Sequence, residues 1–292
     1  MSIRLLALDI DGTLLNSRWE LPAENADAVR RAVDRGVEVA LVTGRRFDFA
    51  RPVMDALAVP LTMIVSNGAV VKDDSGATVI RRLLGRDTVL KVLDRVQPWR
   101  DCAGLLFDRA HDAQIVFERI DPLDVARQRF YEVNRHAIAE RPLHTCLGED
   151  PVQIMFSGPV ARMRALREHL LGGESHPAGL TGPCDGPPYS VSITEYEHRD
   201  FALLDVMAPG CSKGAAVAAW AVRRGLTRDH VMAIGDNLND LEMLEFAGLP
   251  IVMGNAAAAL RARANGWRVT ASNDDAGVAL AIREWLLDRT DA

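Results

Sequence analysis

The sequence predicts an α/β fold, a doubly wound and mostly parallel sheet with a second, α+β domain inserted into it. At both ends of the chain, near-continuous apolar runs alternate with segments of helical period. In the middle, apolar and polar residues alternate instead, which indicates an antiparallel sheet with helices on one face. A chain of 292 residues is long enough for two domains. We therefore expect a core from residues 1–84 and 209–292, and an inserted domain from residues 85–208.

The first segment begins with an apolar run at residues 3–8 that stops at Asp9. Such a run is typical of a parallel strand that is buried on both faces. A helix should follow and end near Gly36, because apolar residues recur at helical spacing before that glycine. Further strands are expected at 37–42 and 61–65, and a hairpin at 70–80.

In the inserted segment, apolar residues at spacings of three and four predict helices through 126–137 and 160–170. Alternating patterns predict strands at 114–118, 190–194 and 201–207. The Gly/Pro-rich stretch 172–188 is interpreted as a loop.

The last segment returns to the pattern of the first. The expected helices are 213–224, 239–247 and 278–287, and the expected strands are 231–234, 250–253 and a weak one near Val269.

Composition excludes several classes of function. The net charge is −6, and a mildly acidic chain does not favour binding to nucleic acid or to anionic membranes. The four cysteines form no C-x-x-C pair, so neither a zinc site nor a disulfide framework is expected. The apolar run at 3–8 is too short for a signal peptide, and no stretch reaches the ~20 apolar residues that span a bilayer. We therefore expect a cytoplasmic protein.

Four polar clusters stand where strands should end. The first is Asp9-Ile10-Asp11-Gly12-Thr13. Two carboxylates after a buried strand can hold a hard cation and can divide the roles of nucleophile and acid. The alternative interpretation is an acidic turn without chemistry.

Two further clusters suit an anion. Thr43-Gly44-Arg45 follows the second strand, where a hydroxyl and backbone N–H groups could bind a phosphate, although Thr43 could simply cap a helix. Lys213 begins an apolar helix, where its charge opposes the helix dipole unless an anion compensates it. Alternatively, Lys213 points into solvent.

The fourth cluster is Gly235-Asp236-Asn237-Leu238-Asn239-Asp240, after the strand at 231–234. A capping turn accounts for one or two of its polar side chains but not for all four. Ligands of open parallel sheets bind beyond the carboxyl ends of the strands, so we expect the four clusters to meet there.

These motifs, in this order, resemble the haloacid dehalogenase superfamily in its Cof-type branch of small-molecule phosphatases. Four further matches support the resemblance: Ser66–Ala69, Ser212–Gly214, Met253–Ala256 and 269–279. The resemblance implies a Rossmann-like core with an α/β cap. It also implies a Mg²⁺-dependent phosphatase that cleaves a small phosphorylated metabolite, such as a sugar phosphate or cofactor phosphate, through an aspartyl-phosphate.

By the same resemblance, Asp9 is the nucleophile, and Asp11 is the general acid and then the base. The residues implied to bind the phosphate are Thr43, Gly44, Lys213 and Asn239. The groups implied to bind the metal are the side chains of Asp9 and Asp236 and the backbone carbonyl of Asp11. Asp240 is implied to act on the metal's waters or to orient Lys213.

Two other functions fit these residues. A phosphomutase or phosphotransferase would use the same aspartyl chemistry with a sugar hydroxyl as the acceptor. A non-catalytic module that binds a phosphorylated metabolite is the second, although binding alone would not require both Asp9 and Asp11.

Overall fold

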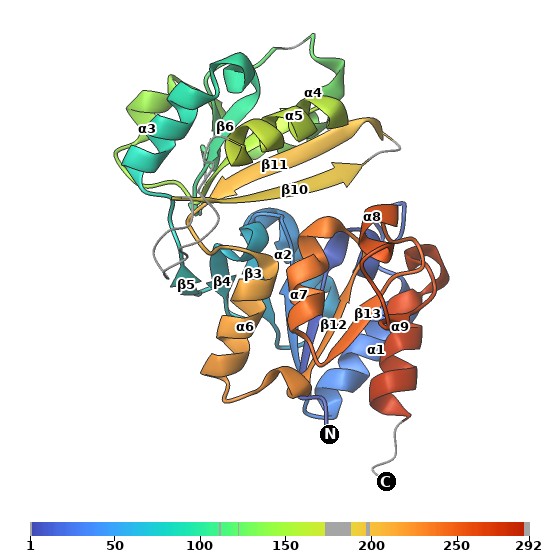
Figure 1. Cartoon of the computed structure of the whole chain (residues 1–292). Helices are drawn as coiled ribbons and strands as arrows, with labels where there is room; N and C mark the ends of the chain where they lie inside the picture. The colour runs from blue at the N-terminus through green and yellow to red at the C-terminus, as the bar shows by residue number, and fades with distance from the viewer. Residues whose placement is uncertain (1, 111, 122, 173–187, 197–198, 289–292) are drawn as a thin grey trace, which may run out of the picture. The chain divides into compact units, whose positions relative to one another are not determined.

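The computed structural model describes residues 2–110, 112–121, 123–172, 188–196 and 199–288. The chain divides into two compact units, Met1–Arg81 with Ser212–Ala292, and Arg82–Cys211 (Figure 1). The sequence predicted crossings after residues 84 and 208. Apart from its two ends, the expected loop at 172–188 lies outside the described residues, as does Cys184.

The first unit is built on an eight-stranded sheet with the order β14-β13-β12-β1-β2-β3-β4-β5. The strands from β14 to β3 are parallel, and β4 and β5 are antiparallel to their neighbours. Their bounds are β1 Leu5–Leu8, β2 Glu38–Val42, β3 Thr62–Val65, β4 Val70–Lys72, β5 Thr78–Arg81, β12 Val231–Gly235, β13 Leu249–Val252 and β14 Arg268–Val269.

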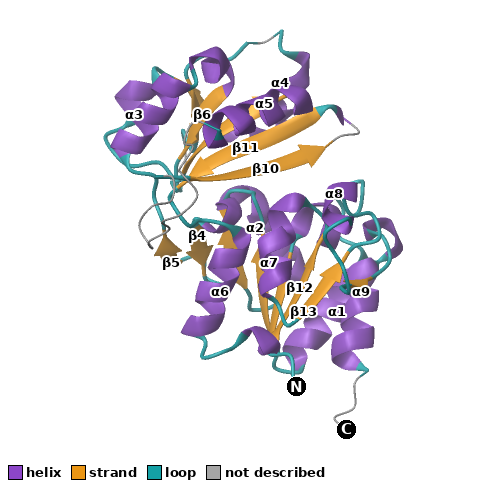
Figure 2. Ribbon diagram, viewed as in Figure 1, coloured by secondary structure: helices purple, strands orange, loops and turns teal. Residues whose placement is uncertain are grey.

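Helices cover both faces of this sheet (Figure 2). Leu5 and Ala7 of β1 share a core cluster with residues of α6 and α7. Leu6 and Leu8 point to the opposite face, since side chains alternate along a strand. On the other side of the unit, α1 and α9 pack on each other. The bounds are α1 Ala23–Asp34, α2 Phe47–Leu57, α6 Lys213–Arg223, α7 Leu241–Phe246, α8 Ala258–Arg261 and α9 Gly277–Ile282. The predicted doubly wound α/β core is confirmed.

The second unit has a six-stranded sheet with the order β10-β11-β9-β6-β7-β8. Its strands are β6 Ala103–Leu106, β7 Ile115–Phe117, β8 Ile138–Glu140, β9 Gln153–Gly158, β10 Ser190–Tyr196 and β11 Phe201–Met207, and its helices are α3 Arg86–Arg95, α4 Val125–Asn134 and α5 Val160–Leu171. All pairs are antiparallel except β7 with β8, which are parallel. The α+β prediction for the insert is confirmed. The prediction that its sheet is antiparallel is wrong for this one pair of strands.

Two details of the insert differ from the sequence prediction. The helix expected through residue 137 ends at Asn134, and Val133 on its apolar stripe is 40% exposed. The strand expected at 114–118 shortens to Ile115–Phe117. Phe117 is buried because Phe130 and Tyr131 pack edge-on against its ring. Among the described residues, no helix combines the length and apolar character that crossing a bilayer requires.

A left-handed turn ends β3 and positions the loops beside it. Ser66, Asn67 and Gly68 all have positive φ, at 50°, 50° and 93°. The N–H of Ser66 donates to the carbonyl of Arg45 at 2.8 Å, and that of Asn67 donates to Thr43 at 3.0 Å. This strained conformation is therefore fixed by the loop that follows β2.

Gly68→Ala should destabilise the first unit strongly. A Cβ at Gly68 would lie 2.3 Å from the backbone oxygen of Ser212, in addition to the strain of the positive φ. Gly36→Ala is the matched control, because Gly36 has φ +80° but nothing within 4 Å of an added Cβ. We expect a loss of about 1 kcal/mol for the control and at least about 2 kcal/mol more for Gly68→Ala. Urea unfolding measures both, and equal losses would contradict the steric argument.

Candidate active site

The end of β1 carries a sharp turn that places Asp9. Residues Ile10–Leu14 form a tight turn in which Asp11 is extended and Gly12 has φ 77°. The N–H of Leu14 donates back to the carbonyl of Asp9 at 3.3 Å. A Cβ at Gly12 would lie 2.4 Å from Oδ2 of Asp236, so only glycine allows these two loops to approach so closely.

Three asparagine side chains hold this turn in place. Their amides donate to backbone carbonyls of the turn and the residue after it at 2.8–3.0 Å, and they are Asn25, Asn255 and Asn273. Asn255 donates to Gly12, and its Oδ1 accepts from the N–H of Asn273. The segments containing residues 255 and 273 thus support the geometry of the first motif.

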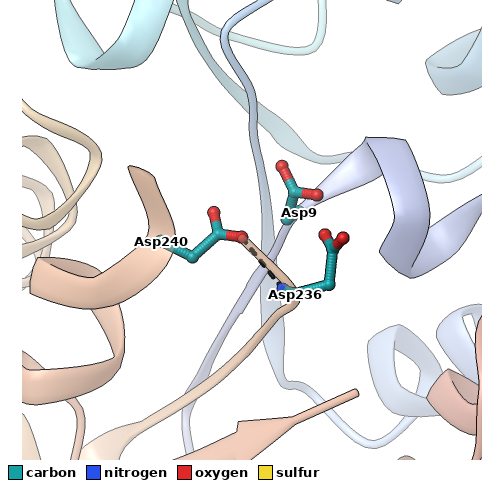
Figure 3. Close-up of side chains that lie close together, drawn as sticks. All are labelled: Asp9, Asp236 and Asp240. Carbon is teal, nitrogen blue, oxygen red and sulfur yellow. Dashed lines mark hydrogen bonds between the residues drawn. The ribbon is translucent and has the colours of Figure 1, made fainter. Parts of the chain in front are cut away.

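Three carboxylates face a common space beside this turn (Figure 3). One oxygen from each of Asp9, Asp236 and Asp240 lies within 4.8 Å of the other two. Asp9 comes from the end of β1, and the other two come from the loop after β12. All three side chains are buried. Asp236 also accepts a hydrogen bond from the hydroxyl of Thr13 at 3.0 Å.

Lys213 joins two of these carboxylates. It is the first residue of α6, whose N-cap Ser212 accepts from the N–H of Ala215 at 3.0 Å. The Nζ of Lys213 lies 2.6 Å from Oδ1 of Asp9 and 2.6 Å from Oδ1 of Asp240. The alternative that Lys213 points into solvent is therefore wrong, since its side chain is 2% exposed. The two carboxylates compensate its position at the helix N-terminus.

Both oxygens of Asp240 bind other groups of the chain. Oδ1 accepts from Lys213, and Oδ2 accepts from the backbone N–H groups of Asp236 and Asn237, each at 3.0 Å. The side chain thus fixes the ammonium of Lys213 and the backbone of the loop after β12. This arrangement suits a positioning residue.

The pKa values reflect an excess of buried negative charge. Burial, reinforced by Asp240 and Asp11 and opposed by Lys213, raises the pKa of Asp9 to about 7. Burial and the charges of Asp9 and Asp240 also raise the pKa of Asp236 well above its usual range. Burial alone would lower the pKa of Lys213, but the carboxylates of Asp240 and Asp9 outweigh it and raise that pKa. Three carboxylates therefore share one buried cation.

Asp11 lies apart from this group and pairs with Arg45. Its two oxygens accept from Nε and Nη2 of Arg45 at 2.8 and 2.5 Å, in a bidentate ion pair. The guanidinium of Arg45 lies 4.7 Å from the ring centre of Phe49 and 5.7 Å from that of Trp19. The Asp11 side chain is 24% exposed, so this pair borders solvent.

The Thr43–Arg45 turn is not a helix cap. Helix α2 begins at Phe47 with Arg46 as its N-cap, so the alternative of an N-capping Thr43 is wrong. The hydroxyl of Thr43 accepts from the N–H of Arg45 at 3.1 Å within the turn. Its side chain is buried.

Asn67 connects the second and fourth motifs. A Cβ at Gly44 would lie 3.1 Å from Oδ1 of Asn67, and that oxygen accepts from Nδ2 of Asn239 at 3.3 Å. The turn after β2 and the loop after β12 therefore meet at this side chain.

The structure thus brings the predicted site residues together beyond the carboxyl ends of the parallel strands. The side chain of Asp11 is the exception, because it turns toward Arg45. The residues to which the sequence assigned no role are Thr13, Arg45 and Asn67, although each lies inside a motif that the sequence singled out. What could have identified them in the sequence is their position in the loops that follow parallel strands, where ligands of such sheets bind.

Comparison with known proteins identifies the family and the fold. The family model described as haloacid dehalogenase-like hydrolase matches residues 6–282. Among curated relatives, the 5-amino-6-(5-phospho-D-ribitylamino)uracil phosphatase YcsE of Bacillus subtilis is 27% identical over 98% of this chain and 97% of its own length. The pyridoxal phosphate phosphatase YbhA of Escherichia coli is 28% identical over 91% of this chain and 93% of its own.

Solved structures share the fold. A haloacid dehalogenase-like hydrolase from B. subtilis superposes with a TM-score of 0.77 and 24% identity, over 97% of this chain and all of that one. A protein from Streptococcus mutans superposes with a TM-score of 0.78 and 18% identity, over 97% of this chain and 99% of that one. With the family model spanning nearly the whole chain, this protein belongs to the haloacid dehalogenase-like hydrolases.

Proposed function

We propose that this hydrolase is a Mg²⁺-dependent phosphatase that cleaves a small phosphorylated metabolite through an aspartyl-phosphate on Asp9. The observation that carries the proposal is the Asp9 carboxylate itself. It stands at the carboxyl end of the central strand, with Lys213 bound to Oδ1 and Asp236 beside it. A nucleophile, a cation for the phosphoryl oxygens and a second carboxylate are thereby placed within one cluster.

The donor atoms fit a hard divalent cation. The group offers carboxylate oxygens without His or Cys, which suits Mg²⁺ better than zinc. Asp9 and Asp236 would hold the ion directly, together with the backbone carbonyl of Asp11. Asp240, whose oxygens already accept three hydrogen bonds, would act on its waters or through Lys213. When bound, the ion would offset the excess negative charge and reduce repulsion between Asp9 and the phosphate.

The chain's own groups then account for the two steps. In the first, a carboxylate oxygen of Asp9 attacks phosphorus, the ester P–O bond breaks, and Asp11 gives its proton to the leaving alcohol. In the second, Asp11 takes a proton from water, which attacks the aspartyl-phosphate and releases phosphate and the free Asp9. Lys213 and the hydroxyl of Thr43 would bind phosphoryl oxygens, with Gly44 and Asn239 shaping the pocket. Asp11 must turn at least one oxygen away from Arg45 to take part.

The substrate we propose is a phosphate monoester of a metabolite or cofactor. The support is that YcsE and YbhA, which match nearly the whole chain, are phosphatases of a ribitylaminouracil phosphate and of pyridoxal phosphate. We further propose that the core carries the chemistry and that the inserted unit contributes to selectivity as a cap.

Asp9→Asn should abolish turnover while the fold survives. The amide keeps the shape of the side chain but cannot form the acyl-phosphate, so kcat should fall by about 10³ or more. Release of inorganic phosphate from a panel of metabolite phosphates measures this. Asp27→Asn, at an exposed position, is the control and should keep wild-type rates. A kcat for Asp9→Asn above about a tenth of wild type would refute the covalent mechanism.

Removal of divalent ions should silence the enzyme reversibly. EDTA followed by dialysis should stop phosphate release, and added Mg²⁺ should restore it while Zn²⁺ should not. Independently of activity, Mg²⁺ should raise the melting temperature of wild type, because it binds the folded state alone. Asp236→Asn should lose most of that increase. Full activity in EDTA would overturn the metal requirement.

The metal-free protein should lose stability as pH rises from about 4 to about 7. The pKa of Asp9 is about 7 in the folded state against 3.8 for an ordinary aspartate, so the folded state binds more protons across this interval. The contribution is fully present below pH 4 and lost above pH 7. Asp9→Asn should therefore match wild type near pH 4 but melt at least about 3 °C higher at pH 8, in EDTA. Equal melting temperatures at pH 8 would contradict the raised pKa.

A further inference from the structure

The loop between the first motif and α1 holds a tryptophan in an unusual conformation. Trp19 has φ +65°, a region that glycine or asparagine adopts readily and that bulky side chains avoid. Burial of its side chain compensates only in part, because Trp19 is 40% exposed. A strained backbone under an exposed aromatic ring indicates a functional role more readily than a packing role.

Backbone hydrogen bonds hold this loop in one conformation and so place the indole. The N–H of Asn16 donates to the carbonyl of Glu20 at 3.0 Å, and the N–H of Trp19 donates to the carbonyl of Asn16 at 2.9 Å. The N–H of Ser17 donates to Asp274 at 2.8 Å, which ties the loop to the segment beside α9. Such preorganisation reduces the entropy lost when a ligand binds.

The indole stands next to the group that would receive the leaving alcohol. The guanidinium of Arg45 lies 5.7 Å from the Trp19 ring centre and forms the bidentate ion pair with Asp11. In the proposed reaction, Asp11 protonates the ester oxygen. The carbon skeleton attached to that oxygen therefore leaves beside Asp11, which turns one oxygen away from Arg45 to act, and Trp19 borders that pair through Arg45.

The polar side chains around Trp19 bind one another. Asn16 donates to Glu20 at 3.1 Å, and Arg18 donates to the same carboxylate at 2.8 Å. The Oδ1 of Asn16 accepts two backbone N–H groups of the loop. A sugar requires several hydrogen-bonding groups directed at its hydroxyls, and these side chains are already engaged. The large apolar side chain of the loop is the indole of Trp19, which is 40% exposed and has the Arg45 guanidinium over its ring.

We propose that Trp19 is a specificity-determining residue that stacks on a planar ring in the alcohol portion of the substrate. This inference rests on the proposed phosphatase function and narrows its substrate class. The preferred substrates are phosphate monoesters in which an aromatic or heteroaromatic ring lies one or two bonds from the ester oxygen. Ring stacking on an exposed tryptophan is tolerant of ring identity and contributes chiefly to binding.

The test compares benzyl phosphate, a planar probe, with glycerol 2-phosphate, which has no ring, in wild type, Trp19→Phe and Trp19→Gly. Glycine suits the positive φ, so Trp19→Gly removes the ring while relieving the backbone strain and should not lower the melting temperature. For benzyl phosphate, KM should rise about tenfold in Trp19→Gly and less than about twofold in Trp19→Phe, with kcat unchanged. For glycerol 2-phosphate, KM should change little in either variant. Equal changes for both probes, or none, would overturn the stacking role.

A second measurement does not depend on turnover. In Asp9→Asn with Mg²⁺, benzyl phosphate should quench tryptophan fluorescence and glycerol 2-phosphate should not. Adding Trp19→Phe should remove the quench while calorimetry still detects binding, and adding Trp19→Gly should weaken that binding about tenfold. If wild type releases no phosphate from any ester but still shows this quench, the phosphatase proposal is wrong while the stacking role of Trp19 stands. If the quench persists after Trp19 is replaced, the stacking role is wrong, and phosphate release by wild type then decides the phosphatase proposal separately.

Discussion

The buried ammonium of Lys213 is the interaction on which the rest of the site depends. Its two hydrogen bonds connect β1 through Asp9, the loop after β12 through Asp240, and α6 through its own backbone. These three segments come from both ends of the chain. Removing the ammonium would leave buried carboxylates without their cation, and truncating one partner of such a network costs far more than the pair contributes in net stability. The site is therefore part of what holds the two halves of the core together.

This arrangement also explains why the folded protein tolerates a poor charge balance. A single lysine cannot neutralise Asp9, Asp236 and Asp240, and the raised carboxylate pKa values express that deficit. The network of asparagine amides and the Asp240 hydrogen bonds nevertheless fixes the loops in one geometry. The surrounding fold thus stabilises a cluster that would otherwise repel itself, which is a familiar compromise between stability and function.

Much of the core could be predicted from the sequence because its strands are buried on both faces. The run at 3–8 became β1, Leu5–Leu8, and the polar clusters that follow the strands lie together as expected. The insert was less predictable. The short strand β8 and its parallel pairing with β7 carry almost no periodic signal, and the exposure of Val133 depends on what packs beside it.

The contacts of long side chains were beyond the sequence altogether. Helical and strand spacing says where a side chain starts but not which partner it reaches, so the pairing of Arg45 with Asp11 could not be foreseen. The same holds for Asp240, which was expected near the metal or Lys213 and turned out to bind backbone amides as well. The backbone of Trp19 was equally unpredictable, because residue type favours glycine or asparagine wherever φ is positive.

The strand order has a consequence for the synthesis of the protein. On the ribosome, β1 can pair with β2 soon after both emerge, but its other neighbour, β12, begins only at Val231. At about 5–20 residues per second, the apolar edge of β1 therefore waits roughly ten seconds or longer for its partner. The inserted unit is contiguous in the chain and can complete its own sheet during that interval. The nascent chain thus presents an open sheet edge, a site for chaperone binding or for mispairing between neighbouring chains, until β12 emerges and pairs with β1.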